Sequence, residues 1–280
     1  MSELAIPPEQ LGKGSACRLQ IVADAEAVTR TFGAMLAEEY QAAKARGRDK
    51  VVFIVPVGPV GQFDLWAEHA NRTRQSLRDL VLVNMDEYLT ADGRACIPIE
   101  DPLSFRGHMQ RHLWDKLDPA LAPPPEQRHF PDPLRPQATT ELIARLGGVD
   151  VCFGGVGITG HLAFNDPPEP GETVSAEAFA DLPTRVVRLN RETLTINSVT
   201  AARGNIARIP PLAVTVGMRE ILQSRKIRIF MNRPWQCAVV RRLLHGPVIS
   251  AVPASLLQRH ADVLLTITNE VAQLPEPILR

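Results

Sequence analysis

Six short apolar runs alternate with stretches of helical periodicity, and this alternation constrains the fold more than any other feature of the chain. Continuous apolar character is typical of parallel strands that are covered on both faces. Segments between the runs repeat apolar residues every three or four positions, as amphipathic helices do. Regular alternation of strand and helix predicts an α/β fold with an open, mostly parallel sheet and helices on both faces. The expected strands are 18–22, 51–56, 79–84, 149–153, 226–231 and 261–266, and the expected helices are 23–46, 62–77, 103–117, 139–146, 192–203 and 236–245.

Two irregular stretches interrupt this Rossmann-like pattern. Leu121–Pro136 is rich in proline and has no periodicity, which indicates a surface connection, because strand–helix alternation resumes directly after it. Pro167–Pro183 follows the richest motif in the chain and is a candidate mobile lid. We therefore expect residues 1–280 to form a single α/β domain with a lid at 167–183.

Charge and cysteine usage narrow the function classes. Thirty-one basic and thirty-one acidic residues cancel, so no global field attracts nucleic acid or an anionic membrane. The four cysteines form no CxxC pair and indicate reduced thiols, without a disulfide framework or a metal site. The N-terminus lacks the pattern of a secretory signal, and no apolar run approaches the roughly 20 residues of a spanning helix. These features predict a cytoplasmic protein that acts on a small molecule without a metal or cofactor.

The residues with the clearest chemistry follow three of the expected strands. Pro56-Val57-Gly58-Pro59-Val60-Gly61 follows the second strand, and Asn84-Met85-Asp86-Glu87-Tyr88 follows the third. The segment 154–166 (GGVGITGHLAFND) follows the fourth. Ligands of open α/β sheets bind beyond the carboxyl ends of the strands. Glycines there let the backbone approach a ligand, and an Asp and a His on neighbouring loops divide base and acid roles.

These motifs resemble the glucosamine-6-phosphate deaminase/isomerase family, which is related to the 6-phosphogluconolactonases. The resemblance is carried by NMDEY at 84–88 and GGVG-x-x-GH-x-AFN at 154–165, with further likeness at 104–119 and 213–217. It covers most of the chain from about residue 18 to 266, in the family's order. It implies an enzyme of amino-sugar metabolism that opens a hexose ring, moves a proton between C2 and C1, and expels ammonia from C2. It also implies members that range from monomers to homo-oligomers.

The resemblance assigns catalytic roles to four residues. Asp86 matches the base that takes the C2 proton, and His161 matches the histidine that helps to open the ring. Thr159 stands where the family has aspartate, and Asp166 stands where it has glutamate. Because threonine carries no charge, an imidazolium at His161 is expected to lose one stabilising partner, which impairs ring opening or changes the substrate.

The candidate substrate-binding residues are Gly58, Gly61, Glu87, Gly157, Gly160 and Arg185. The family holds a 6-phosphate at the loop that aligns with 56–61, where this chain has valine at both threonine positions and Pro59 has no N–H. Two further phosphate-binding positions align with Val199 and Gln236. A phosphate there keeps few charge-assisted hydrogen bonds. We therefore expect either a substrate without a phosphate or recognition of the phosphate by Arg106, Arg185 or Arg233.

Two other functions remain open from the sequence. A sugar lactonase resembling the 6-phosphogluconolactonases shares the GH motif, but that family favours a different motif where NMDEY stands. A non-catalytic sugar sensor also shares the fold, and only about 17 residues precede the first strand, which leaves no helix-turn-helix. Ammonia release, acid formation from a lactone, or binding without turnover distinguish the three.

Overall fold

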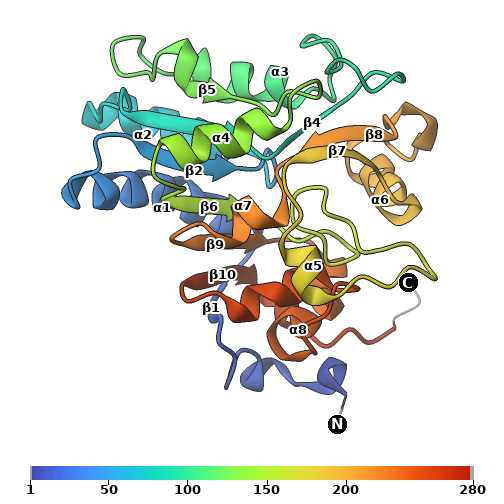
Figure 1. The fold of residues 1–280 in the computed structure, drawn as a ribbon. Helices are drawn as coiled ribbons and strands as arrows, with labels where there is room; N and C mark the ends of the chain where they lie inside the picture. The colour runs from blue at the N-terminus through green and yellow to red at the C-terminus, as the bar shows by residue number, and fades with distance from the viewer. Residues whose placement is uncertain (1, 278–280) are drawn as a thin grey trace.

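The computed structural model describes residues 2–277, and its main sheet is parallel throughout (Figure 1). Within those residues this sheet has seven strands in the order β1-β10-β9-β6-β2-β3-β5, and every neighbouring pair is parallel. The predicted open, mostly parallel α/β sheet is confirmed. The strands are β1 (Arg18–Val22), β2 (Val51–Val55), β3 (Leu80–Asn84), β5 (Arg128–His129), β6 (Val151–Gly154), β9 (Ile227–Met231) and β10 (Val263–Thr268).

The central strands are apolar on both faces because each face meets its own core. Along β2, Val51, Phe53 and Val55 belong to one hydrophobic cluster, while Val52 and Ile54 belong to another. Successive side chains of a strand point to opposite faces, so an unbroken apolar run serves two cores at once. This explains why these strands could be located from the sequence.

Helices pack against both faces of the main sheet. The first cluster contains residues of α1 and α2, and the second contains residues of α4, α7 and α8. Asp24 caps α1 by accepting from the Ala27 N–H at 2.8 Å. The helices are α1 (Ala25–Ala45), α2 (Gln62–Thr73), α3 (Phe105–Met109), α4 (Gln137–Arg145), α5 (Ala176–Ala180), α6 (Arg191–Ala201), α7 (Met218–Leu222), α8 (Cys237–His245) and α9 (Asn269–Ala272), and α3 continues into a π-helical turn at Gln110–Trp114.

A second, antiparallel sheet was not predicted. It has the order β4-β8-β7, with β4 at Asp86–Tyr88, β7 at Arg185–Arg188 and β8 at Leu212–Thr215. Its strands are only three or four residues long, too short to show a periodicity. In Figure 1, β7, β8 and α6 lie together beyond one end of the main sheet.

Both irregular stretches contain more structure than the sequence indicated. Within the proline-rich connection, Arg128–His129 forms β5 and pairs with β3 at the sheet edge. Within 167–183, the helix α5 buries Phe179 against the core, and the role of this segment as a lid stays a prediction. None of the helices among residues 2–277 is long and apolar enough to cross a membrane.

Candidate active site

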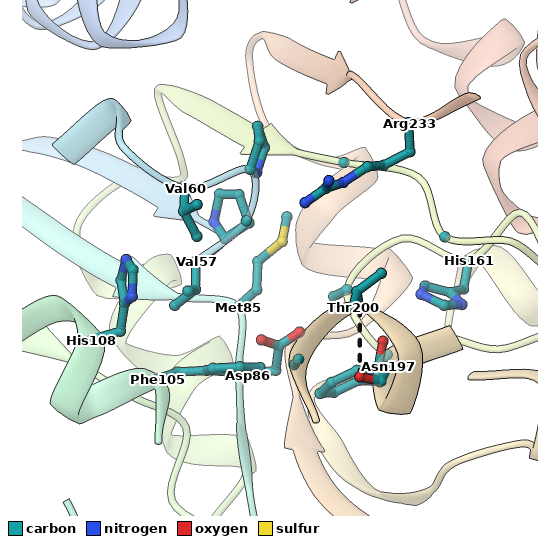
Figure 2. Close-up of a pocket in the computed structure, with 18 of the residues that line it drawn as sticks. Val57, Val60, Met85, Asp86, Phe105, His108, His161, Asn197, Thr200 and Arg233 are labelled. Atoms are coloured by element: carbon teal, nitrogen blue, oxygen red, sulfur yellow. Dashed lines mark hydrogen bonds between the residues drawn. The ribbon is translucent and has the colours of Figure 1, made fainter. Parts of the chain in front are cut away.

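A pocket of about 410 Å³ lies at the carboxyl ends of four parallel strands, a size that small-molecule sites commonly have. The segments that follow β2, β3, β6 and β9 all contribute to its lining, and α3 and α6 close it. Figure 2 shows Asp86 and Met85 near its centre, with His161 on one side and Val57 on the other. The sheet topology thus brings Asp86 and His161, which are 75 positions apart, into one cavity.

Asp86 faces the pocket with an unusually basic carboxylate. Its backbone, in β4, pairs with Thr215 of β8. Within residues 2–277 its side chain has no hydrogen-bond partner, although it is nearly fully buried. Burial, and then the negative charge of Glu87, raise the pKa of Asp86 to about 8. A carboxylate with this pKa, open to a ligand and free of partners, is suited to proton transfer near neutral pH.

Glu87 does not reach the pocket, contrary to its expected role as a substrate-binding residue. It is the next residue along β4, so its side chain points to the opposite face from that of Asp86. There it accepts hydrogen bonds from Ser104 Oγ at 3.0 Å and from the N–H groups of Phe105 and Arg106 at 3.0 and 2.8 Å. Glu87 therefore anchors the start of α3 and influences Asp86 through its charge.

His161 is held by the carboxylate of Asp166, although Thr159 stands where the family has an aspartate. Its Nδ1 lies 2.8 Å from Asp166 Oδ1. A carboxylate only accepts, so Nδ1 carries the proton and Nε2 is the basic nitrogen of the neutral ring. Burial raises the pKa of Asp166. Hydrogen bonds from His161, Thr193 and the Asn190 backbone outweigh this effect and hold that pKa below its usual range. The shorter aspartate thus still reaches the ring.

Two threonine hydroxyls bracket this contact. Thr159 Oγ1 lies 2.9 Å from His161 Nδ1 and 3.1 Å from Asp166 Oδ1. Thr193, which could not be selected from the sequence, lies 3.2 Å from His161 Nδ1 and 2.6 Å from Asp166 Oδ1. Each hydroxyl has one proton to donate, and the acceptor-only oxygen of Asp166 receives it. Neither threonine lines the pocket, so both contact the His161 ring on the side that faces away from it.

The other candidate substrate-binding residues divide between the pocket and its supports. Gly58 and Gly157 line it. Gly157 also permits close packing, since an added Cβ would lie 2.0 Å from the His161 ring. Gly61 and Gly160 lie outside the lining, where φ values of +102° and +85° fit their tight turns. Arg185 also lies outside the lining of this pocket. Its guanidinium donates to Asn165 Oδ1 at 2.7 Å, and the residue lines a second pocket of about 340 Å³.

Of the three arginines considered for a phosphate, only Arg233 lines the main pocket. Its guanidinium points into the cavity (Figure 2) and has no hydrogen-bond partner among residues 2–277. Arg106 is engaged with Ile97 O and Glu87. Val199 is 63% exposed and lies outside the lining. The side-chain amide of Gln236 donates to Val156 O and accepts from the Arg233 N–H. Neither position is available to hold a phosphate as in the family.

Several lining residues were not predicted from the sequence, among them Asn197, Thr200 and His108. Asn197 and Thr200 face the pocket from α6 at a spacing of three, and Asn197 Nδ2 donates to Tyr88 Oη at 2.9 Å. His108 faces it from α3 (Figure 2). The helical spacing of Asn197 and Thr200 was a usable signal, whereas nothing local distinguished His108. Residues 2–277 contain no cluster of three or more His, Cys, Asp or Glu able to hold a metal ion.

Solved structures define the class of fold. The chain superposes on a monomeric glucosamine-6-phosphate deaminase of the NagB superfamily with a TM-score of 0.74 at 23% identity, covering 91% of this chain and 98% of that one. It superposes on 6-phosphogluconolactonase from Trypanosoma brucei with a TM-score of 0.64 at 16% identity, covering 91% and 97%. The protein therefore has the α/β fold that these sugar-phosphate enzymes share.

Curated relatives place the chain within that class. It is 32% identical to the glucosamine-6-phosphate deaminase of Bacillus velezensis over 204 residues, 70% of this chain and 76% of the relative. It is 27% identical to the enzyme of the same name from Rhodopirellula baltica over 271 residues, 94% and 98% of the two chains. No protein-family model matches. The chain belongs to the glucosamine-6-phosphate deaminase family and is an enzyme of carbohydrate metabolism.

Proposed function

We propose that this enzyme deaminates and isomerises an amino sugar, with Asp86 as the base that moves the proton from C2 to C1. The observation that carries the proposal is the pairing in one pocket of an unpartnered carboxylate, whose pKa is raised to about 8, with a histidine whose Nδ1 is held by Asp166. The family's deaminase relatives support the same chemistry.

The steps follow from the two side chains. His161, with Nε2 basic, takes the proton of the C1 hydroxyl and delivers it to the ring oxygen, which opens the ring. Asp86 then removes the C2 proton while O1 takes a proton from the substrate's C2 ammonium group, which gives an enolamine. Asp86 returns its proton to C1, so that C1 becomes a CH₂OH group and the C2–N bond becomes an iminium. Water adds to the iminium, ammonia leaves, and a ketose remains. One carboxylate serves both carbons when it lies within hydrogen-bond reach of each.

A coupled assay for ammonia tests this function with amino sugars as substrates. We expect ammonia release by the wild type and its loss in Asp86→Asn. Formation of acid from a lactone without ammonia would identify a lactonase, and ligand binding without any turnover would identify a sensor. We further infer a single domain over residues 1–280, a small-molecule partner and a cytoplasmic location, in keeping with its metabolic relatives. A homo-oligomeric state stays an expectation.

A further inference from the structure

The pocket has two chemically different ends. His161 lies at one end, and Val57, Val60 and His108 lie at the other, with Asp86 between them (Figure 2). On the proposed function, Asp86 and His161 fix C1, C2 and the ring oxygen of a sugar. The remainder of the sugar, including its C6 substituent, then extends toward the loop between β2 and α2.

This loop offers a sugar mostly apolar surface. The side chains of Val57, Pro59 and Val60 line the pocket, and Pro59 has no backbone N–H. A phosphate dianion bound here keeps some backbone amides but gains no hydroxyl and no charge from a loop side chain. Burial of charge without paired partners is costly. The loop therefore favours an uncharged group.

His108 is a polar group at this end, and no residue in the described part of the chain forms a hydrogen bond with its ring. Its Nε2 is closed off from solvent, so a ligand can meet only the Nδ1 edge of the ring, and neither ring nitrogen has a hydrogen-bond partner among residues 2–277. The ring stacks on His112 at 4.2 Å between centroids, and Asp64 holds His112 at 3.0 Å. Burial, and then the charges of His112 and Arg111, lower the pKa of His108 to about 4. Since His108 lines the pocket and its Nδ1 has no partner among residues 2–277, this neutral imidazole can bond to a ligand's hydroxyl through Nδ1.

We propose that the far end of the pocket binds an uncharged hydroxyl, that His108 is its hydrogen-bond partner, and that the substrate is an amino sugar without a 6-phosphate. This proposal rests on the proposed function and specifies its substrate class. Arg233, whose guanidinium points into the cavity, is the one Lys or Arg among the described lining residues, and because the residue is exposed its charge stays hydrated and screened by salt. The 6-phosphate positions of the family at Val199 and Gln236 add no second cation.

The first test compares three probes on the wild type: glucosamine, its 6-deoxy analogue and glucosamine 6-phosphate. We expect kcat/KM to be at least about tenfold higher for glucosamine than for the phosphate ester. A preference of tenfold or more for the phosphate ester, abolished by Arg233→Gln, would overturn the proposal and assign Arg233 as the phosphate-binding residue.

The second test asks whether His108 contacts the hydroxyl. His108→Phe keeps an aromatic ring on His112 but removes the hydrogen bond, so kcat/KM for glucosamine should fall about three- to tenfold. The 6-deoxy analogue lacks the hydroxyl and should be turned over equally by both enzymes. Equal losses on both sugars would show a merely structural effect and refute the contact. His112→Phe, which changes a ring outside the pocket, should leave the ratio of the two sugars unchanged.

Failure of the proposed function gives a different pattern. If no probe releases ammonia, the proposed deamination is wrong, and the distal site is then judged by thermal shift with the same three probes. A larger stabilisation by glucosamine than by its phosphate ester supports the site at His108. The reverse order, or no stabilisation by either sugar, contradicts it.

Discussion

Asp86 links catalysis and stability to pH. Its folded-state pKa of about 8 lies above the ordinary value of 3.8, so the folded protein keeps a proton that the unfolded chain has lost between these limits. The unfolding free energy contributed by Asp86 is therefore fully present below pH 4 and falls as the pH rises to about 8. The same ionisation creates the base, so kcat/KM should rise with pH up to about 8.

Asp86→Asn separates these two effects. The amide cannot ionise, so the variant should be more stable than the wild type above pH 8, by an amount on the order of a few kcal/mol. The difference should shrink toward pH 5. Urea unfolding at pH 5 and pH 9 measures it, with surface Asp49→Asn as the matched control. A pH-independent difference would show that Asp86 ionises normally in the folded protein.

Thr193 is predicted to position His161 through Asp166. Thr193→Val keeps the shape but removes the hydroxyl that lies 2.6 Å from Asp166 Oδ1. We expect kcat to fall about ten- to a hundredfold with little change in KM, since hydrogen bonds to charged groups contribute about 1.5–3 kcal/mol. Thr193→Ser should restore activity, and Thr195→Val on the exposed side of α6 should match the wild type. A loss of melting temperature without loss of kcat would leave Thr193 a structural residue only.

Among the elements, the central strands of the main sheet could be predicted from the sequence, whereas the elements that shape the pocket could not. The runs that became β2 and β3 were visible because both of their faces are buried. The three-residue strand β4 carries no such signal, yet its pleat decides that Asp86 faces the pocket and Glu87 faces α3. Likewise, His108 and Thr193 reach the site only through the packing of α3 and α6, which one sequence does not reveal.

In the segment after β6, the His161 ring packs directly against the backbone of Gly157. Gly157→Ala would place a methyl group 2.0 Å from Cε1 and Nε2 of the ring, so the ring must move. A displacement of about 1 Å is expected to cost at least about a hundredfold in turnover. Steady-state kinetics with the melting temperature as a fold check measure this loss. Turnover within threefold of the wild type would mean that the orientation of His161 is not needed.

In the molecule as a whole, Arg241 joins segments that are far apart in the sequence. Its fully buried guanidinium donates to the carbonyl oxygens of Ile6, Cys237, Ala272 and Gln273. This ties the N-terminal segment and the residues after α9 to α8. These contacts could not be predicted from the sequence, because backbone carbonyl acceptors are present at every residue.

Arg241→Met should lower the unfolding free energy by about 3 kcal/mol, because it leaves two buried and two partly buried carbonyl groups without their donor. The neighbouring Arg242 is exposed, so Arg242→Met serves as the control and should change stability by less than about 0.5 kcal/mol. Urea unfolding of both variants makes the comparison. Equal stabilities would show that water replaces Arg241 without cost.

The assignment of Asp86 as the proton-transfer base rests on the pocket as a unit, and solvent exchange tests it. The reaction is run in D₂O with glucosamine and its 6-phosphate, and the product is examined by NMR for deuterium at C1. We expect partial deuteration at C1 together with ammonia release in the wild type, because the Asp86 carboxyl exchanges part of its proton with solvent before returning it. We expect neither in Asp86→Asn while binding persists. Undiminished exchange in Asp86→Asn, or lactone hydrolysis by the wild type with no exchange on either sugar, would contradict the assignment.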